Sequence, residues 1–275
     1  MALANGGLPQ QGLPDPAMDG KRDNQMFASS LATGLGVLLA FSADEPGLTN
    51  AALARRTGLS RATISRVTFT LCEMGLLYYD STDRQYRIGP GAVSLGYPFM
   101  LHLRIQHVAL PMMQAFADRH RTTVSLGMRS GLHMIYIDSC RSFEGSEFRA
   151  DAGASLPMLR TAMGRVWLAA QAPAERRRVC DELRQSLPSD WRKYAPALRE
   201  SITSISTRGY CVNTGDLHAD LQAVAAPLAV SVAGRTVVLN TGLPTELVRA
   251  GVLDRLGKAL AKLAQKVEAA WRDHE

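Results

Sequence analysis

A run of basic and small polar residues has the spacing needed to read double-stranded DNA. Arg61, Ala62, Thr63, Ser65 and Arg66 stand close together at the start of a predicted helix. An arginine can bind a guanine edge with two hydrogen bonds, an alanine or threonine methyl can contact a thymine methyl, and a serine can donate or accept. The run predicts a helix that contacts bases in the major groove, with Arg66 as the guanine-binding candidate. Surface charge on an ordinary helical hairpin is the alternative interpretation.

The neighbouring residues predict the elements that would position this run. Residues 49–67 are typical of two short helices joined by a three-residue turn, and Gly58 suits the positive φ of such a turn. Thr70 extends the exposed face of the second helix, whereas Phe69 does not fit base-reading chemistry and is expected to pack on a neighbouring element. A helix over 29–41 precedes this pair.

Two β-prone runs, 76–80 and 85–89, are separated by a polar turn and complete a predicted winged helix-turn-helix. Arg84 and Arg87 of this wing, like Arg61, are better placed to bind phosphates than bases. Over residues 46–90 six arginines stand against three acidic residues, a small excess. Because phosphate contacts supply much of the affinity for DNA, we expect tight binding to need two copies.

The second half of the chain predicts an α+β domain with an antiparallel sheet. An apolar helical stretch runs from Gly91 to Val108, and Pro111 is expected to open the next helix. Strands are then predicted over 122–128, 134–139, 210–213, 221–230 and 236–241, and helices over 161–171, 173–185, 196–208 and 245–272. The expected organisation is a tail (1–26), a winged helix-turn-helix domain (27–90), a linker helix (91–108) and a second domain (109–275).

Composition restricts the classes of protein that remain. The 275 residues are 46% hydrophobic and 20% charged, with a net charge of +6 that suits an anionic partner without proving one. The tail is rich in Gly, Pro and polar residues, which predicts disorder rather than a secretory signal. No apolar run is long enough to cross a bilayer, and the four cysteines form no metal or redox motif. We therefore expect a cytoplasmic protein with no membrane contact, no metal and no cofactor.

Motifs in both halves resemble the IclR family of bacterial transcriptional regulators, over nearly the whole chain from about residue 27. The residues that carry the resemblance are Leu48-Thr49, 52–59, Arg61-Ala62-Thr63, Arg66, Thr70-Leu71, Gly75, 86–89, Leu156-Pro157, 161–165, 208–210 and 224–227. The resemblance implies a winged-helix domain, a linker helix used in dimerisation and a GAF-like effector-binding domain. It further implies a homodimer or dimer of dimers on a partly palindromic operator, with a small organic acid as effector.

The resemblance also implies a place for the effector, between the sheet and the loop before the helix at 161–171, where free N–H groups attract a carboxylate. By position, the residues expected there are Phe148, Leu156, Arg160, Ala162, Met163, Asn213, Leu221, Ala223, Leu239 and Thr241. Ala223, Leu239 and Arg160 depart from the family pattern and favour a larger or aromatic acid. Alternatively, Arg160 points to solvent and the apolar residues are plain core. Arg84 stands where the wing usually has glycine.

Two other functions are compatible with the same elements. The second domain could mediate only protein contacts, or it could be a DNA-tethered enzyme. The sequence has no GxSxG elbow, no phosphate-binding loop of the GxxxxGK type and no HExxH pair, which makes an enzyme the weakest of the three hypotheses.

Overall fold

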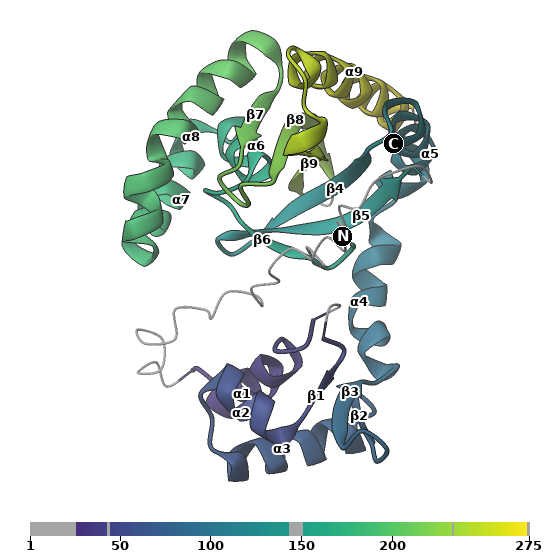
Figure 1. Cartoon of the computed structure of the whole chain (residues 1–275), viewed down its shortest axis with the longest axis vertical. Helices are drawn as coiled ribbons and strands as arrows, with labels where there is room; N and C mark the ends of the chain where they lie inside the picture. The colour runs from purple at the N-terminus through teal and green to yellow at the C-terminus, as the bar shows by residue number, and fades with distance from the viewer. Residues whose placement is uncertain (1–25, 43–44, 143–150, 233, 274–275) are drawn as a thin grey trace. The chain divides into compact units, whose positions relative to one another are not determined.

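The computed structural model describes residues 26–42, 45–142, 151–232 and 234–273. The chain forms two compact units, which meet in sequence between His102 and Leu103. The elements of the first are α1 (Ser29–Leu38), β1 (Gly47–Leu48), α2 (Asn50–Thr57), α3 (Arg61–Glu73), β2 (Leu77–Asp80), β3 (Gln85–Ile88) and α4 (Gly91–His102) (Figure 1). All of the predicted tail except Met26 lies outside the described residues.

The helix-turn-helix forms because both of its helices are capped. The Thr49 side chain accepts a hydrogen bond from the Ala52 N–H at the start of α2, and the Ser60 side chain does the same for Thr63 at the start of α3. Gly58 ends α2 with φ 69°, a left-handed conformation that glycine adopts without strain. The two helices and the turn match the sequence expectation.

The wing is a small antiparallel sheet in the order β1-β3-β2. Its first strand, β1, has two residues and was too short to predict from a pattern of side chains. The helices and this sheet enclose a core made of Val37, Leu48, Leu53, Ile64, Leu71, Leu76 and Leu77. Arg84 adopts φ 53° between β2 and β3, so the arginine occupies the left-handed position where a glycine was expected.

Helix α4 is apolar, and none of its residues is buried. It ends at His102, so the single helix predicted to Val108 is wrong: the next helix, α5 (Ile105–His120), starts after a break at Leu103 and Arg104. Pro111 lies inside α5 rather than at its start. The buried stripe of α5 continues on both sides of Pro111, and its packing stabilises a helix that the proline alone would weaken.

The second unit is built on a six-stranded antiparallel sheet in the order β6-β5-β4-β9-β8-β7 (Figure 1). Its strands are β4 (Thr123–Ser130), β5 (His133–Arg141), β6 (Ser155–Pro157), β7 (Cys211–Thr214), β8 (Leu221–Val232) and β9 (Arg235–Pro244). Its remaining helices are α6 (Ala162–Ala170), α7 (Pro173–Ser186), α8 (Pro188–Arg208), the short η2 (Thr245–Leu247) and α9 (Val252–Arg272). These elements confirm the predicted α+β class.

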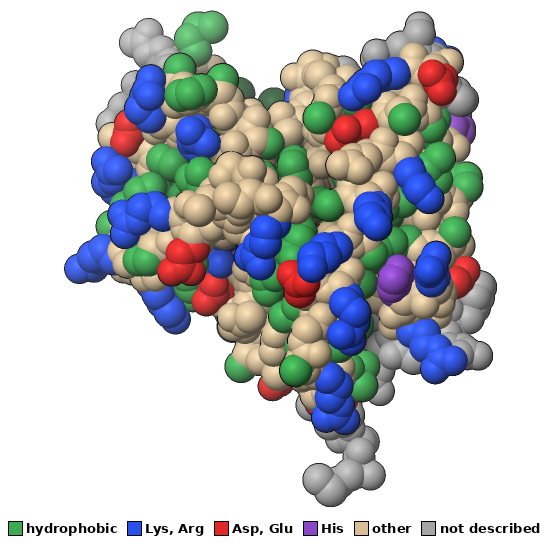
Figure 2. Space-filling model, turned by 90° about the horizontal axis from the view of Figure 1, so that it is seen from above, with side chains coloured by type: hydrophobic (Ala, Val, Ile, Leu, Met, Phe, Trp, Pro, Cys, Tyr) green, Lys and Arg blue, Asp and Glu red, His purple; other side chains and the backbone are tan. Residues whose placement is uncertain are grey.

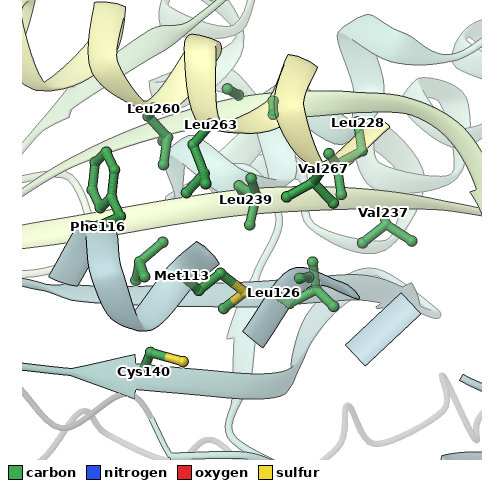
Figure 3. Close-up of a cluster of buried hydrophobic side chains, with 14 of the residues drawn as sticks. Met113, Phe116, Leu126, Cys140, Leu228, Val237, Leu239, Leu260, Leu263 and Val267 are labelled. Carbon is green, nitrogen blue, oxygen red and sulfur yellow. The ribbon is translucent and has the colours of Figure 1, made fainter. Parts of the chain in front are cut away.

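Helices cover both faces of this sheet. On one face, Met113 and Phe116 of α5 and Leu260 and Leu263 of α9 pack with Leu239 of β9 (Figure 3). On the other face, α6, α7 and α8 form a separate core. Its members include Met134, Met163, Val179 and Leu198. Strand β5 shows the alternation, with Met134 and Tyr136 in one core and Ile137 in the other.

Two further helix starts in this unit differ from the prediction. Helix α8 begins at Pro188 rather than at Pro196, and α9 begins at Val252 rather than at residue 245. Tyr194, Leu198 and Ser201 are the buried residues of α8, so the helix packs on both sides of its internal proline. A proline in a sequence thus marks a helix start only where no such packing spans it.

Two further properties concern the surface. On the face seen in Figure 2, Lys and Arg side chains are dispersed, with acidic side chains among them. Among the residues that the structure describes, no helix is long and apolar enough to cross a membrane.

Candidate DNA-reading helix and effector cavity

The exposed face of α3 carries most of the predicted DNA-contacting residues. Arg61, Ala62, Ser65, Arg66 and Thr70 are exposed, while Thr63 is half-buried. Ile64, Thr68 and Leu71 lie on the opposite side, in the core of the unit. In the described part of the chain, the guanidinium groups of Arg61 and Arg66 have no hydrogen-bond or ion-pair partner. Both cations are therefore available to an anionic ligand.

Three of the hydroxyl groups that were predicted to contact DNA already have partners within the chain. The Asn50 Nδ2 atom donates to the Ser65 Oγ at 2.9 Å, so α2 orients a residue of α3 that was predicted to contact DNA. Thr70 donates to the Arg66 carbonyl at 3.1 Å, and the Thr63 hydroxyl lies 2.9 Å from the Ser60 hydroxyl in the cap. Asn50 was missed in the sequence because its partner lies fifteen residues away on another helix.

The two wing arginines differ in their surroundings. Arg87 donates to the Asp83 carboxylate at 2.8 Å and lies 3.4 Å from that of Asp80. The Asp83 hydrogen bond raises the pKa of the Arg87 guanidinium. Arg84, in contrast, has no such partner among the described residues. Of the two, only Arg84 has its full charge free for a phosphate.

A cavity lies between the sheet and the N-terminal end of α6. Its walls combine apolar and polar side chains from β5, β6, α6, β7, β8, β9 and the loops that join them. The lining residues are Tyr136, Leu156, Arg160, Thr161, Ala162, Met163, Asn213, Leu217, Leu221, Ala223, Asn240 and Gly242. The cavity has a volume of ≈ 20 Å³. That is room for roughly one water, so a larger ligand must widen it.

Seven of the predicted effector-binding residues line this cavity, and two do not. The seven are Leu156, Arg160, Ala162, Met163, Asn213, Leu221 and Ala223. Leu239 packs into the opposite core with α5 and α9 (Figure 3). The Thr241 hydroxyl lies 2.9 Å from that of Thr122, where both residues are buried. Placing Leu239 and Thr241 at the cavity is therefore wrong, because successive residues of a strand face opposite sides of the sheet. Phe148 lies outside the described residues.

Asn240, between these two, faces the cavity, as does Gly242 of the same strand. Its Nδ2 atom donates to the Tyr136 hydroxyl at 3.2 Å, and burial raises the pKa of Tyr136, which keeps the phenol neutral. Sequence reasoning missed both residues, together with Thr161, Leu217 and Gly242. An amide side chain in the middle of the mostly apolar run 237–243 was the signal that could have identified Asn240.

Arg160 faces the cavity but is already paired. Its Nε and Nη2 atoms donate to the two carboxylate oxygens of Asp190 in α8, each at 2.8 Å. These hydrogen bonds raise the pKa of the Arg160 guanidinium. The guanidinium carbon also lies 5.7 Å from the centre of the Tyr194 ring. Arg160 is thus neither a free cation of the cavity nor a purely solvated one.

Side chains cap the start of α6, but some backbone N–H groups there remain unpaired. Thr161 caps the helix by accepting from the Gly164 N–H at 3.1 Å, and Asn213 donates to the Arg160 carbonyl at 2.8 Å. Within the described chain, the N–H groups of Ala162 and Met163 have no acceptor. Unpaired N–H groups at a helix start attract an anion. A group of three or more His, Cys, Asp or Glu residues able to hold a metal is absent from the described residues.

The comparisons with known proteins agree with both units. Residues 30–81 match the IclR helix-turn-helix domain, and residues 99–269 match the bacterial transcriptional regulator IclR C-terminal domain. The HTH-type transcriptional regulator TsaQ1/TsaQ2 of Comamonas testosteroni is 30% identical over 246 residues, which are 88% of each chain.

Solved structures give the same result. An IclR family transcriptional regulator from Brucella abortus is 31% identical, with a TM-score of 0.74 over 91% of this chain and 95% of that one. An IclR homologue from Microbacterium hydrocarbonoxydans, solved in complex with 4-hydroxybenzoate, shares the fold at 22% identity and a TM-score of 0.68, over 89% of this chain and 99% of that one.

A winged helix-turn-helix joined to this C-terminal domain, together with the family matches, defines a DNA-binding transcriptional regulator with an effector-binding C-terminal domain. The chain belongs to the IclR family. Its partners are DNA, through the helix-turn-helix, and a small-molecule effector in the C-terminal domain. It is a regulator and not an enzyme, as the motif search predicted.

Proposed function

We propose that α3 reads a partly palindromic operator and that a small organic acid, apolar or aromatic rather than two-carbon, binds in the cavity beside α6 and controls this binding. The observation that carries the proposal is the pair of unpaired N–H groups of Ala162 and Met163 at the edge of a cavity with both apolar and polar walls. A carboxylate there would gain two hydrogen bonds and the favourable end of the helix dipole.

The composition of the walls supports an aromatic or large apolar acid. Leu156, Met163, Leu217 and Leu221 supply apolar surface, while the Tyr136 and Asn240 pair supplies polar atoms within the same cavity. A two-carbon acid would leave most of that apolar surface without a contact, which forgoes the burial that gives small ligands much of their affinity. The 4-hydroxybenzoate bound to the Microbacterium homologue makes this acid a rational first probe.

Self-association is part of the same proposal. Helix α4 carries large apolar side chains that are exposed in the single chain. They are Val93, Leu95, Tyr97, Phe99, Met100 and Leu101. Six exposed apolar side chains on one helix are more apolar surface than monomeric proteins usually leave in water. We infer that α4 pairs with α4 of a second copy, so that two α3 helices contact two half-sites of the operator.

A melting screen tests the ligand. The full chain is heated with benzoate, 4-hydroxybenzoate, acetate or pyruvate, and with the uncharged benzamide and 4-hydroxybenzamide. A ligand that binds only the folded protein stabilises it, by about 2.7 kcal/mol at a hundredfold excess over Kd. We expect an increased Tm with the aromatic acids and little change with acetate, pyruvate or the amides. Equal shifts for acid and amide would contradict the carboxylate site, and no shift with any acid would favour a domain that mediates only protein contacts.

A further inference from the structure

Phe69 is an aromatic side chain in an unexpected position on α3. It was expected to pack on a neighbouring element, but 67% of its surface is exposed, and it is not a member of the unit's core. A buried phenylalanine contributes about 1.5–3 kcal/mol to stability relative to an exposed one. Phe69 makes no such contribution in the described chain, so its role must be sought outside the core.

The position of Phe69 on the helix is the second observation. Ala62, Ser65, Arg66 and Phe69 follow the spacing i, i+3, i+4 and i+7, which places them on one face of an α-helix. Homeodomains contact successive bases with four residues of the same spacing on their recognition helix. Phe69 therefore lies on the same face of α3 as Arg66, about one turn nearer the C-terminal end of the helix.

The charges around Phe69 favour a polyanion over an apolar protein surface. Arg61 and Arg66 lie on the N-terminal side of Phe69 without any partner in the described chain. The acidic residue of α3, Glu73, lies one turn farther on, toward the C-terminal end of the helix. The end of α3 that carries Ala62 and Arg66 is thus entirely basic or neutral, as a helix inserted among phosphates requires.

We propose that Phe69 is a specificity-determining residue whose ring contacts the C5-methyl group of a thymine in the major groove, beside the base that Arg66 contacts. This inference rests on the proposed reading of DNA by α3. A phenyl ring offers no donor or acceptor, so a base that presents only polar atoms there would lose its water without gaining a partner. Thymine is the base that presents a methyl group in the major groove, so Phe69 favours it.

The test compares thymine with deoxyuridine, which lacks only that methyl group. Duplexes are selected from a random-sequence library with the full-length protein, and each thymine of the selected duplex is then replaced by deoxyuridine. At one T·A pair in each half-site, we expect the replacement to weaken binding of the wild-type chain about three- to tenfold. Phe69→Ala should bind both duplexes equally.

Met74→Ala is the matched control, because Met74 is an apolar residue at the end of the same helix with a similar exposed fraction of 64%. It should retain the sensitivity to deoxyuridine. Because both side chains are exposed, neither substitution should change the Tm. If Phe69→Ala selects the same sequence and keeps the same sensitivity to deoxyuridine, the inference is overturned. It is also overturned if Phe69→Ala changes only the molar mass of the protein in solution, which would indicate a protein contact.

Arg66→Ala separates this inference from the proposed function. If Arg66→Ala loses sequence selection while Phe69→Ala does not, α3 reads DNA without help from Phe69. If the wild-type chain selects no sequence at all, the reading of DNA by α3 fails and the inference fails with it.

Discussion

Asp190 holds Arg160 by two hydrogen bonds of 2.8 Å at the wall of the cavity beside α6. The pair joins the segment before α6 to the first turn of α8 across thirty residues of sequence. It also neutralises the charged side chain that lines the cavity. An acid that enters the cavity must therefore compete with Asp190 for Arg160 or rely on the N–H groups of α6.

Asp190→Asn should increase the affinity for an aromatic acid. An asparagine keeps the size of the side chain but leaves the charge of Arg160 unbalanced, so the carboxylate of the ligand gains attraction. We expect a Kd for 4-hydroxybenzoate that is lower by about three- to tenfold, measured by calorimetry. Asp181→Asn is the control, since Asp181 pairs with Arg184 on the exposed surface of α7. Unchanged or weaker binding by Asp190→Asn alone would show that Arg160 takes no part.

Gly127→Ala should narrow the cavity from the side of the sheet. A Cβ atom on Gly127 would clash with the Met163 Sδ, so the thioether must leave its place against β4. Because Met163 lines the cavity, we expect its displaced side chain to occupy space that the ligand needs and so to weaken acid binding. The substitution should also lower the stability of the protein by about 1–3 kcal/mol.

Met163→Ala in the Gly127→Ala background should restore binding, and calorimetry would measure both effects. Gly36→Ala, at a glycine with open space around it, is the control for added bulk elsewhere. Full acid affinity in Gly127→Ala, with the expected loss of stability, would place the ligand away from Met163.

Arg84→Gly should affect stability and DNA binding in opposite directions. The arginine holds φ 53°, which glycine adopts without strain, so the substitution should stabilise the wing by about 0.5–1 kcal/mol. The same change removes a cation that is free to bind a phosphate. We expect weaker binding to all DNA sequences alike and a smaller dependence of log Kd on log salt, by about one unit per site. A change in the selected sequence would contradict the assignment of Arg84 to the phosphates.

Leu95→Glu should weaken the proposed pairing of α4. Leu95 is 62% exposed in the single chain, so the substitution should leave the fold of the chain intact while placing a charge in the α4 interface. Light scattering coupled to size exclusion should show a lower molar mass at the same protein concentration. Leu247→Glu, at an apolar residue of η2 that is 50% exposed, is the control and should leave the mass unchanged. An unaltered mass in Leu95→Glu would place the interface elsewhere.

Helices and strands that depend on the local side-chain pattern and on capping residues were predictable from the sequence. The helix-turn-helix was predictable because Gly58 acts locally at the turn, and the Thr49 and Ser60 caps that the structure adds are equally local. The break between α4 and α5 was not found, since the packing of α5 overrides the expected effect of Pro111.

Seven cavity residues were predictable by their position in the family pattern. The pattern did not determine which residues of β9 face the cavity. The error at Leu239 and Thr241 is a shift of one residue, which reverses every side chain of a strand. The Arg160 and Asp190 pair could not be predicted, because the order of α7 and α8 across the sheet decides which carboxylate reaches Arg160.

The most direct test of the account is the affinity of the full chain for its selected duplex, measured by fluorescence anisotropy with and without 4-hydroxybenzoate. Linkage requires that an effector which changes DNA affinity does so through unequal binding to the two states of the protein, and couplings of about 5–150-fold are usual. Ala162→Pro removes one N–H at the first position of α6, where proline is tolerated, and Ala162→Ser keeps it. We expect a change of Kd for DNA of at least fivefold in the wild type and in Ala162→Ser, and a much smaller one in Ala162→Pro. An acid that stabilises the protein but leaves its affinity for DNA unchanged would contradict the account.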